Sequence, residues 1–390
     1  MTPHSIFYTG GLELVGAVLL IKTLTIMSRR LLIARPGHIY LATYTSASAT
    51  ITIDLDESFP GNPSWFAISP ADPHLLYTFD EGGSTTCAFR MDLSVNTLTK
   101  VAQSEDGSNG VCHLAFNKEG TILIGTSWAE GTIDIWNTES ENPELITTIQ
   151  SKDPVVDAGR VARAHEAVLD PTGRFFVVND LGTDSILVLD ALRPDVPVVR
   201  RVTVPSGSGP RHGVFYPAGE GKPATHYFLL CETSNRVEVF KLKYTEVDIE
   251  FTATGGYSTF LDEDMGAFAA AGEIALSKDG GHVYTSNRLM TTPTETIAHF
   301  RVKPEGDDGE LELELVGETS TQGKHPRMFS LSRTGNELFV GNQEGEWAVV
   351  VLRRKEDGTL EEEPVAGVLM EDIVKGEGDE RGPMFVLEVV

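Results

Sequence analysis

Short apolar runs separated by polar turns recur along most of the chain. From residue 37 onward, each repeat consists of a polar turn, an apolar run, an Asp-Gly or Thr-Gly type turn, a second apolar run and a third run of alternating polarity. Runs such as residues 174–179 (RFFVVN) and 282–286 (HVYTS) are rich in β-branched and aromatic residues, which favours strands over helices. The pattern therefore predicts an all-β array of repeated antiparallel sheets.

The repeats have the length of propeller blades. Equivalent positions recur about every 50 residues, which suits a four-stranded antiparallel blade. A seventh blade would combine residues 38–45 (HIYLATYT) with residues 384–390 (MFVLEVV), so that the two chain ends pair and leave no free sheet edge. The fold expected for residues 36–390 is a seven-bladed β-propeller. Its other blades would be residues 63–92, 110–137, 164–190, 209–243, 271–303 and 324–353.

Residues 1–35 precede the first repeat and are expected to form a leader outside the propeller. Residues 11–27 (GLELVGAVLLIKTLTIM) are apolar but short for a spanning helix, and they carry Glu13 and Lys22. A signal peptide has positive charge before its apolar run, whereas Arg29 and Arg30 follow this one. We expect no stable membrane insertion. A signal or anchor, or a natural start at Met27, are the alternatives.

The net charge and the cysteine content limit which partners and which cellular compartment can be expected. The formal net charge of -26 and the pI near 4.7 give a field that repels nucleic acid and anionic membranes, so neither is an expected partner. An anionic substrate would need arginines concentrated where it binds. The three cysteines are widely spaced and odd in number, which indicates a reducing compartment, and we predict a cytoplasmic protein. The sequence leaves the oligomeric state open.

Polar residues mark the start of the predicted innermost strand of each blade. In a propeller these strands surround the central channel, so side chains far apart in sequence converge there. The residues at this position are Ser64 and Trp65, Cys112 and His113, His165 and Glu166, Arg211 and His212, Glu273, and Pro326 and Arg327. A second set ends the next strands: Asp180, Glu232, Arg288 and Asn342.

Several long phrases in this order resemble the lactonase family of seven-bladed β-propellers, which includes bacterial 6-phosphogluconolactonase and the fungal 3-carboxy-cis,cis-muconate lactonizing enzyme. The resemblance covers about residues 37–390. The phrases are AHEAVLDPTGRFFVVNDLGTD, GPRHGVF, CETSNRVEVF, GEIALSKDGGHVYTSNR and GKHPRMFSLSRTGNELFVGNQ. One departure from the family pattern is Glu166, where the phrase often continues with glutamine.

The resemblance implies an active site made of His165, Arg211, Glu232 and Arg288. Two guanidinium groups can bind a carboxylate or phosphate bidentately, while the histidine and the glutamate can exchange a proton with the reacting atoms. No metal and no cofactor is expected. The competing interpretation is structural, with the histidine hydrogen-bonded between blades and the arginines paired with carboxylates.

Five further residues are expected to bind substrate or to support the site. They are His212, Glu273, Arg327, His113 and His325. The predicted function is a metal-independent enzyme that forms or opens a small anionic lactone, most like the carboxy-cis,cis-muconate cyclase branch. The alternatives are a hydrolase of a sugar lactone such as 6-phosphogluconolactone, and a noncatalytic propeller that serves as a scaffold or binding protein.

Overall fold

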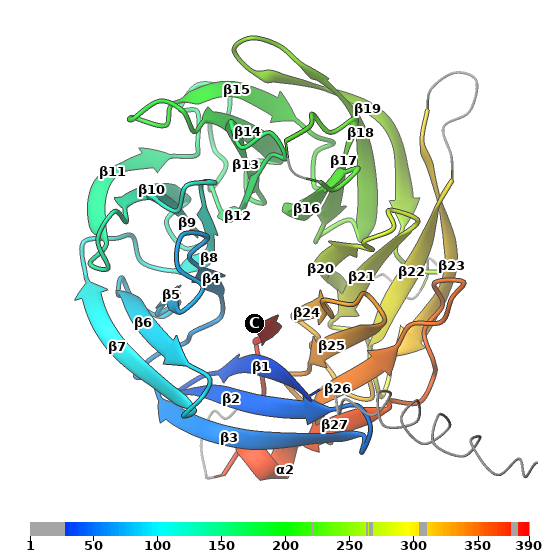
Figure 1. Cartoon of the computed structure of the whole chain (residues 1–390). Helices are drawn as coiled ribbons and strands as arrows, with labels where there is room; N and C mark the ends of the chain where they lie inside the picture. Colours follow the sequence, from blue (N-terminus) through cyan, green and yellow to red (C-terminus); the bar gives the residue numbers. More distant parts are fainter. Residues whose placement is uncertain are drawn as a thin grey trace, which may run out of the picture.

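Seven four-stranded antiparallel sheets surround a common axis, as the sequence predicts (Figure 1). The computed structural model describes residues 28–219, 221–262, 264, 268–303, 310–375 and 381–389. Each sheet runs from an inner strand at the axis to an outer strand at the rim. The described residues contain one short α-helix, α2 (Met370–Ile373), and no helix long and apolar enough to cross a membrane.

Blades 1 to 6 each consist of four strands that are consecutive in the chain. Blade 1 consists of β4 (Phe66–Ile68), β5 (Leu75–Phe79), β6 (Thr86–Asp92) and β7 (Thr97–Ser104). Blade 2 consists of β8 (Val111–Phe116), β9 (Ile122–Ser127), β10 (Thr132–Asn137) and β11 (Glu144–Gln150). Blade 3 consists of β12 (Ala164–Leu169), β13 (Phe175–Asp180), β14 (Ser185–Asp190) and β15 (Val198–Thr203). Blade 4 consists of β16 (Pro210–Tyr216), β17 (His226–Cys231), β18 (Arg236–Tyr244) and β19 (Ile249–Ser258). Blade 5 consists of β20 (Ala270–Leu276), β21 (His282–Arg288), β22 (Thr296–Lys303) and β23 (Glu312–Ser320). Blade 6 consists of β24 (Met328–Leu331), β25 (Glu337–Gly341), β26 (Trp347–Arg353) and β27 (Ala366–Leu369).

The seventh blade closes the ring with both ends of the chain. Its strand order is β28 (Phe385–Val389), β1 (Ser28–Arg35), β2 (His38–Thr45) and β3 (Thr50–Ser58). The pairing of terminal strands is confirmed, but β28 pairs with β1, which lies between β28 and the strand that we expected as its partner. Residues 28–35, which we expected in the leader, therefore belong to the seventh blade. Residues 1–27, which make up most of the expected leader, lie outside the described residues.

The hydrophobic core lies between the blades. One cluster joins Ile133 and Ile135 of blade 2 to Phe176 and Leu187 of blade 3, and the other clusters join neighbouring sheets in the same way. Burial of these faces holds each sheet against the next. All three cysteines are free and buried.

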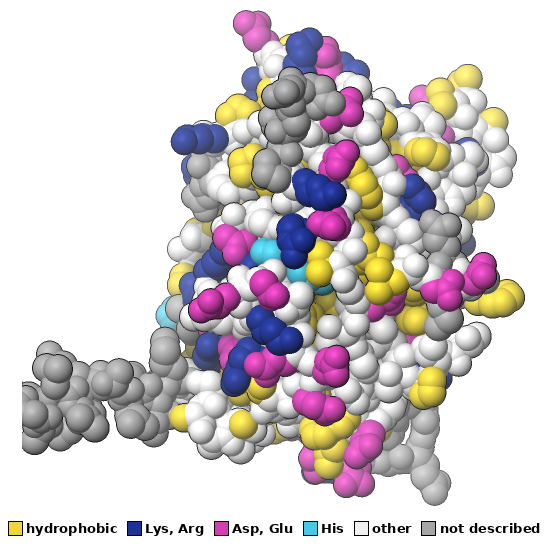
Figure 2. Space-filling view, turned by 90° about the vertical axis from the view of Figure 1, so that its right-hand side faces the viewer, with side chains coloured by type: hydrophobic (Ala, Val, Ile, Leu, Met, Phe, Trp, Pro, Cys, Tyr) yellow, Lys and Arg dark blue, Asp and Glu magenta, His cyan; other side chains and the backbone are white. Residues whose placement is uncertain are grey.

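Acidic and basic side chains are interspersed on the side of the ring that Figure 2 shows, over β18 and β19 and over β22 and β23. Cross-strand pairs such as Lys243 with Glu250 and Arg301 with Glu314 join the two outer strands of blades 4 and 5. No continuous basic stripe is present on this face of the described surface.

Four successive inner strands carry an extra residue near their start. In blade 3, Ala164 pairs with Asp180 and Glu166 pairs with Asn179, so His165 is left out of the ladder. The same irregularity leaves out Cys112 in blade 2 and Arg211 in blade 4, and it occurs between Ala271 and Ile274 in blade 5. A β-bulge re-aims the side chains around it. Two consecutive polar residues can therefore both serve the channel, at different depths.

Candidate active site

The inner strands begin at one end of the channel, and a pocket of about 600 Å³ opens there, which we call the upper pocket. Residues from the starts of inner strands and the ends of second strands line it, because antiparallel neighbours bring these two positions together. The lining residues are Pro36, Asn62, Glu81, Arg288, Leu289, His325, Arg327, Gln343, Arg381 and Met384.

Glu232 holds two arginines from different blades. Its Oε2 accepts hydrogen bonds from Nε of Arg211 at 2.7 Å and from Nη2 of Arg288 at 2.8 Å. The arginines are fixed further by backbone carbonyls, since Arg211 donates to Gly272 O and Arg288 donates to Ala271 O at 2.9 Å. Burial alone would raise the pKa of Glu232, but the charges of the two arginines hold it below its usual value. Glu232 is thus an ionised anchor for the guanidinium groups.

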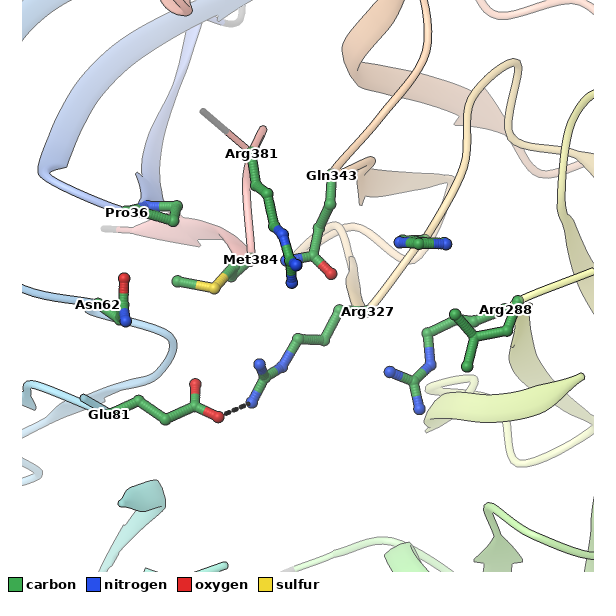
Figure 3. A pocket seen from close by; sticks show the side chains of 10 residues that line it. Pro36, Asn62, Glu81, Arg288, Arg327, Gln343, Arg381 and Met384 are labelled. Atoms are coloured by element: carbon green, nitrogen blue, oxygen red, sulfur yellow. Dashed lines mark hydrogen bonds and ion pairs between the residues drawn. The ribbon is translucent and has the colours of Figure 1, made fainter. Parts of the chain in front are cut away.

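Glu81 and Arg327 form a second ion pair across the upper pocket, with Nη2 and Oε1 2.9 Å apart (Figure 3). Burial would raise the pKa of Glu81, but the charge of Arg327 and its hydrogen bond lower it. Arg288 and Arg381 point toward the same space from other sides of the pocket (Figure 3). Among the described residues, the upper pocket therefore gathers three guanidinium groups and one carboxylate, in a protein that is strongly acidic as a whole.

His165 lies directly beneath the upper pocket. It lines a small internal cavity of about 10 Å³, together with Arg211, His212 and Arg327. The two pockets share Arg327 and Met384. The side chain of His165 is buried, and its Nδ1 has no hydrogen-bond partner among the described residues. Such an orphaned nitrogen at the base of a pocket is positioned to bond with a substrate or water.

Burial and the positive charge concentrated here lower the pKa of two further groups. Burial and then the charge of Arg211 lower the pKa of His165 well below its usual value, so its imidazole is neutral at neutral pH. Burial and the neighbouring Arg211 also lower the pKa of Arg288, to about 10. Nε of Arg288 is buried and has no partner within the described part of the chain. An anion in this place would relieve the repulsion between the two arginines.

A second, wider pocket opens at the other end of the channel, and we call it the lower pocket. It has a volume of about 850 Å³ and is lined mainly by apolar residues from the inner strands, among them Ala167, Val214 and Leu276. Glu166 and Glu273 line it as well. Burial raises the pKa of both glutamates, well above the usual value for Glu166 and to about 8 for Glu273, which favours the protonated form of each carboxyl group.

His212 lies between the two ends of the channel. Its Nδ1 is 2.8 Å from Oε1 of Glu273, and the ring centroid is 5.0 Å from that of His165. Burial and the charge of Arg211 lower the pKa of His212 well below its usual value. The directions of these pKa shifts favour a hydrogen bond between a neutral imidazole and a protonated carboxyl group at the contact of His212 with Glu273.

The structure divides the predicted residues between these spaces. His165, Arg211, Glu232 and Arg288 meet at the base of the upper pocket. Arg327 and His325 line the upper pocket, and His212 lines the internal cavity. His113 and Glu273 line the lower pocket instead, so they are not part of the arginine-rich space. His113 stacks on Trp65 with ring centroids 4.2 Å apart.

Two charged residues of the upper pocket were not among the site residues expected from the sequence. Glu81 follows the second strand of blade 1, at the position that Glu232 occupies in blade 4, so the repeat itself carried the signal. Arg381 lies in the connection to the last strand, which has no counterpart in the other blades, and no pattern pointed to it. Among the described residues, no group of three or more His, Cys, Asp or Glu side chains could hold a metal ion.

Comparison with known proteins identifies relatives over most of the chain. The family model described as "Lactonase, 7-bladed beta-propeller" matches residues 21–368. A protein of Arthroderma benhamiae named "Probable 6-phosphogluconolactonase" is 30% identical over 253 residues, which are 63% of this chain and 62% of that protein. The "6-phosphogluconolactonase" of Formosa agariphila is 24% identical over 347 residues, 85% of this chain and 92% of that one.

A solved structure shares the fold. The periplasmic gluconolactonase of Pseudomonas aeruginosa superimposes with a TM-score of 0.76 and 19% identity, over 93% of this chain and 99% of that one. At this identity the likeness concerns the arrangement of the seven blades alone.

Proposed function

Because this chain belongs to the seven-bladed β-propeller lactonase family and is an enzyme that acts on lactones, we propose that it hydrolyses a sugar lactone that carries an anionic group, of the 6-phosphogluconolactone type. Membership in this family argues against the noncatalytic scaffold. The observation that carries the proposal is the gathering of guanidinium groups in the upper pocket, above a histidine nitrogen that has no partner in the described part of the chain.

The charge distribution supports an anionic substrate. Of the residues that the structure describes, three guanidinium groups and one carboxylate line the upper pocket, although acidic residues outnumber basic ones 57 to 31 in the whole chain. Guanidinium groups bind phosphate and carboxylate through pairs of charge-assisted hydrogen bonds. Asn62 and Gln343 add neutral donors and acceptors for sugar hydroxyl groups. A phosphorylated sugar lactone uses both kinds of group.

The roles of the four central residues follow from their contacts. Arg211 and Arg288 would hold the carbonyl oxygen or the anionic group, since Glu232 and two backbone carbonyls fix both side chains in place. His165 would take a proton from the attacking water, because its imidazole is neutral and Nδ1 has no other partner among the described residues. Glu232 is a weak base beside two arginines and would position them instead of moving the proton.

Cyclisation of a carboxymuconate is the second candidate, and it remains a prediction. Leu289, Met384 and Pro36 give one part of the upper pocket an apolar surface, which would suit the planar carbon chain of such a substrate. The same arginines would bind its carboxylates. The two relatives named 6-phosphogluconolactonase favour hydrolysis over this reaction.

The test is a substrate panel with one variant and one matched control. We expect the wild type to open 6-phosphogluconolactone with a kcat/KM about tenfold or more above that for gluconolactone, because each charge-assisted hydrogen bond contributes about 1.5–3 kcal/mol. Arg288→Lys should lose most of this preference. Arg201→Lys changes an arginine that binds Asp157 and Ser185 away from both pockets, and it should keep the preference.

Two outcomes would contradict the proposal. Loss of the ultraviolet absorbance of a carboxymuconate, with no acid release from either gluconolactone, would assign the second candidate. A phosphorylated lactone opened no faster than its uncharged analogue would show that the guanidinium groups do not select an anion.

A further inference from the structure

The buried pair of His212 and Glu273 connects the two ends of the channel. The His212 ring lines the internal cavity beside His165, and on its other side Nδ1 meets the Glu273 carboxyl group, which lines the lower pocket. Glu166 lies alongside, with Oε1 3.7 Å from the same Nδ1. One imidazole thus separates the proposed reaction site from a second opening to solvent.

We propose that His212 and Glu273 form a proton relay through which the proton released by lactone opening leaves by the lower pocket. The inference rests on the proposed hydrolysis and adds two positioning residues to it. Both act through His165 and neither contacts the lactone.

The reaction leaves one proton to remove. Water forms a new bond to the carbonyl carbon, the bond between that carbon and the ring oxygen breaks, and the ring oxygen takes one proton to become a hydroxyl group. The carboxylic acid that results is ionised at neutral pH, because its pKa is near that of any carboxyl group. Each turnover therefore consumes one water and releases one proton in addition to the hydroxy acid.

The upper pocket is a poor exit for this proton. The carboxylate product and its arginines fill the space above His165, and the guanidinium groups repel a positive charge. Below His165, the internal cavity of about 10 Å³ has room for one water molecule, which would link the imidazole to His212. The two rings are tilted by 60° at a centroid distance of 5.0 Å.

The hydrogen bonds of Glu273 give the relay a direction. Its Oε1 accepts the Ile274 amide at 2.9 Å and lies 2.8 Å from Nδ1 of His212; the relay assigns the proton of this second contact to Nδ1, which makes Oε1 the acceptor in both. The proton of the neutral carboxyl group then belongs to Oε2, which is buried and has no partner among the described residues. A proton arriving at Nε2 of His212 would move the Nδ1 proton to Oε1, and the proton on Oε2 would leave to the lower pocket.

The charges around His212 keep the proton moving. Arg211, Arg288 and Arg327 face the histidine from the upper side and destabilise an imidazolium ion, whereas Glu232 opposes them only in part. His165 and His113 are its uncharged neighbours, at centroid distances of 5.0 and 5.7 Å. On the lower side, Glu273 binds and releases a proton near pH 8, since burial raises its pKa to about that value. A proton therefore passes through His212 and does not stay there.

The lower pocket reaches solvent, as a relay requires. Exposed residues of its mouth include Pro70, Lys118 and Gly219, and the two glutamates lie at its inner end. Apolar side chains form most of the wall between, so the carboxyl groups are the polar groups at which a proton would enter or leave the inner end.

The experiment compares three variants of the full chain. Glu273→Gln keeps the size of the side chain but cannot pass a proton, Glu273→Asp keeps a carboxyl group, and Glu238→Gln changes an acid on β18 that pairs with Arg236 and lines neither pocket. We expect Glu273→Gln to lower kcat roughly 10²-fold with little change in KM, since proton transfer typically contributes 10²–10⁴-fold. Added imidazole should restore part of this loss, Glu273→Asp should retain more activity, and Glu238→Gln should equal the wild type.

Two results would overturn the relay. One is a Glu273→Gln enzyme with the kcat and pH profile of the wild type, and the other is a loss that neither imidazole nor Glu273→Asp repairs. Infrared spectra of the resting protein test the proton without any substrate. The wild type should show a protonated carboxyl band that titrates near pH 8 and that Glu273→Gln lacks. If the wild type opens no lactone, the proposed function fails, and the infrared band still decides whether Glu273 holds the proton; identical spectra would refute the relay independently.

Discussion

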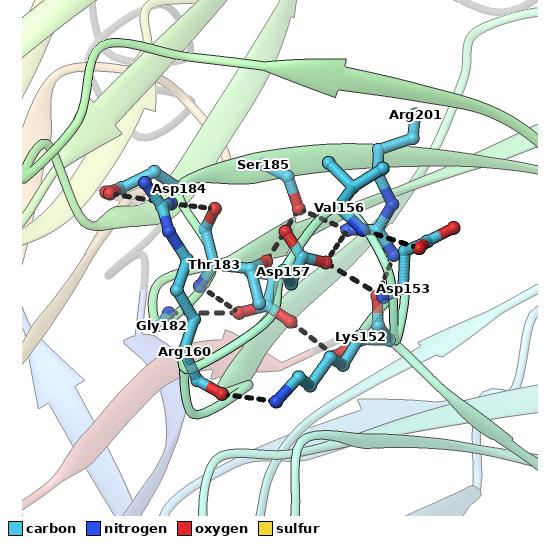
Figure 4. Close-up of polar contacts among 12 residues, drawn as sticks. Lys152, Asp153, Val156, Asp157, Arg160, Gly182, Thr183, Asp184, Ser185 and Arg201 are labelled. Atoms are coloured by element: carbon cyan, nitrogen blue, oxygen red, sulfur yellow. Dashed lines mark hydrogen bonds and ion pairs between the residues drawn. The ribbon is translucent and has the colours of Figure 1, made fainter.

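Two charged clusters in neighbouring parts of the ring are built in opposite ways. The loop cluster, formed by Asp157, Arg160, Asp180, Asp184 and Arg201, ties the connection between β11 and β12 to blade 3 (Figure 4). The channel cluster consists of His165, Arg211, Glu232, Glu273 and Arg288. Both hold buried or half-buried charges, and both border the strand that carries His165.

In the loop cluster, each charged group bonds with several partners. Asp180 Oδ1 accepts the amides of Arg163, Gly182 and Thr183, each at 2.9 Å, and Oδ2 accepts the hydroxyl of Ser151. Asp184 binds Arg160 at 3.1 Å and the amides of two glycines. These contacts fix the backbone immediately before β12 and before β16.

In the channel cluster, polar atoms are left without partners in the described structure. Nδ1 of His165, Nε of Arg288 and Oε2 of Glu273 are all buried and unpaired. The two clusters therefore differ in saturation: the bonds of the loop cluster stabilise the fold, whereas the unpaired atoms of the channel cluster cost stability and would bond with the proposed substrate and proton.

Catalytic activity should distinguish the channel cluster from the loop cluster most clearly. Arg211→Ala should reduce kcat/KM for the preferred lactone about 10²–10³-fold, because it removes a fixed guanidinium group that the proposal assigns to the carbonyl oxygen or the anionic group of the substrate. Arg201→Ala, in the loop cluster, should leave kcat/KM of the folded enzyme near the wild-type value. Steady-state kinetics of both variants check this, and equal losses would erase the functional distinction between the clusters.

Stability should move in the opposite direction for Glu273→Gln. The pKa of Glu273 is raised in the folded protein, so its stabilising effect is complete below the usual pKa of a glutamate and is lost as pH rises to about 8. At pH 7 the raised pKa of Glu273 lowers the free energy of unfolding of the wild type by about 3 kcal/mol, and a neutral glutamine has no such cost. Glu273→Gln should therefore be more stable by up to that amount, and the gain should grow between pH 6 and pH 8. Urea unfolding at several pH values measures it; a less stable variant at pH 8 would contradict the buried neutral carboxyl group.

Asp180→Ala should destabilise the fold without a comparable loss of chemistry. The change leaves three backbone amides without their acceptor, which costs about 2–3 kcal/mol. Thermal unfolding should show a lower Tm, while kcat/KM at a temperature where the variant is folded should fall much less than for Arg211→Ala. An unchanged Tm would mean that the loop cluster does not hold the connection in place.

Gly272 tests how closely the channel cluster is packed. A Cβ atom there would lie 2.4 Å from the Ser286 hydroxyl oxygen and 3.1 Å from Cδ and Nε of Arg288. Gly272→Ala should displace the Arg288 guanidinium group and lower kcat/KM about tenfold, since small misplacements of a binding group are costly. Gly317→Ala, at a glycine with open space around it, is the control and should match the wild type.

The smallest effect is expected from mild acid. Burial and the charge of Arg211 hold the pKa of His165 well below its usual value, so the neutral imidazole persists as pH falls. Between pH 7.5 and pH 6, kcat/KM for an uncharged lactone should change less than about twofold. A midpoint near pH 6.5 would show that His165 titrates as an ordinary histidine or that another group is the base.

Much of the site could be predicted because the repeats locate strand starts and strand ends. The positions of His165, Arg211, Glu232 and Arg288 in their repeats bring them together once the ring closes. Arg381 could not be predicted, since its segment has no equivalent in other blades. The cytoplasmic location and the reaction without metal or cofactor remain predictions.

The strands, their turns and the number of blades could be predicted from the sequence alone, because alternating apolar residues and turn residues favour these structures through contacts between residues close in the chain. Only the tertiary structure decided that β1 belongs to the seventh blade and that the bulges send neighbouring residues such as His165 and Glu166 to different depths. It also decided which carboxyl groups keep a proton, because burial and the charges of residues from other blades set those pKa values. Such effects depend on distances between chain segments, which no local pattern records.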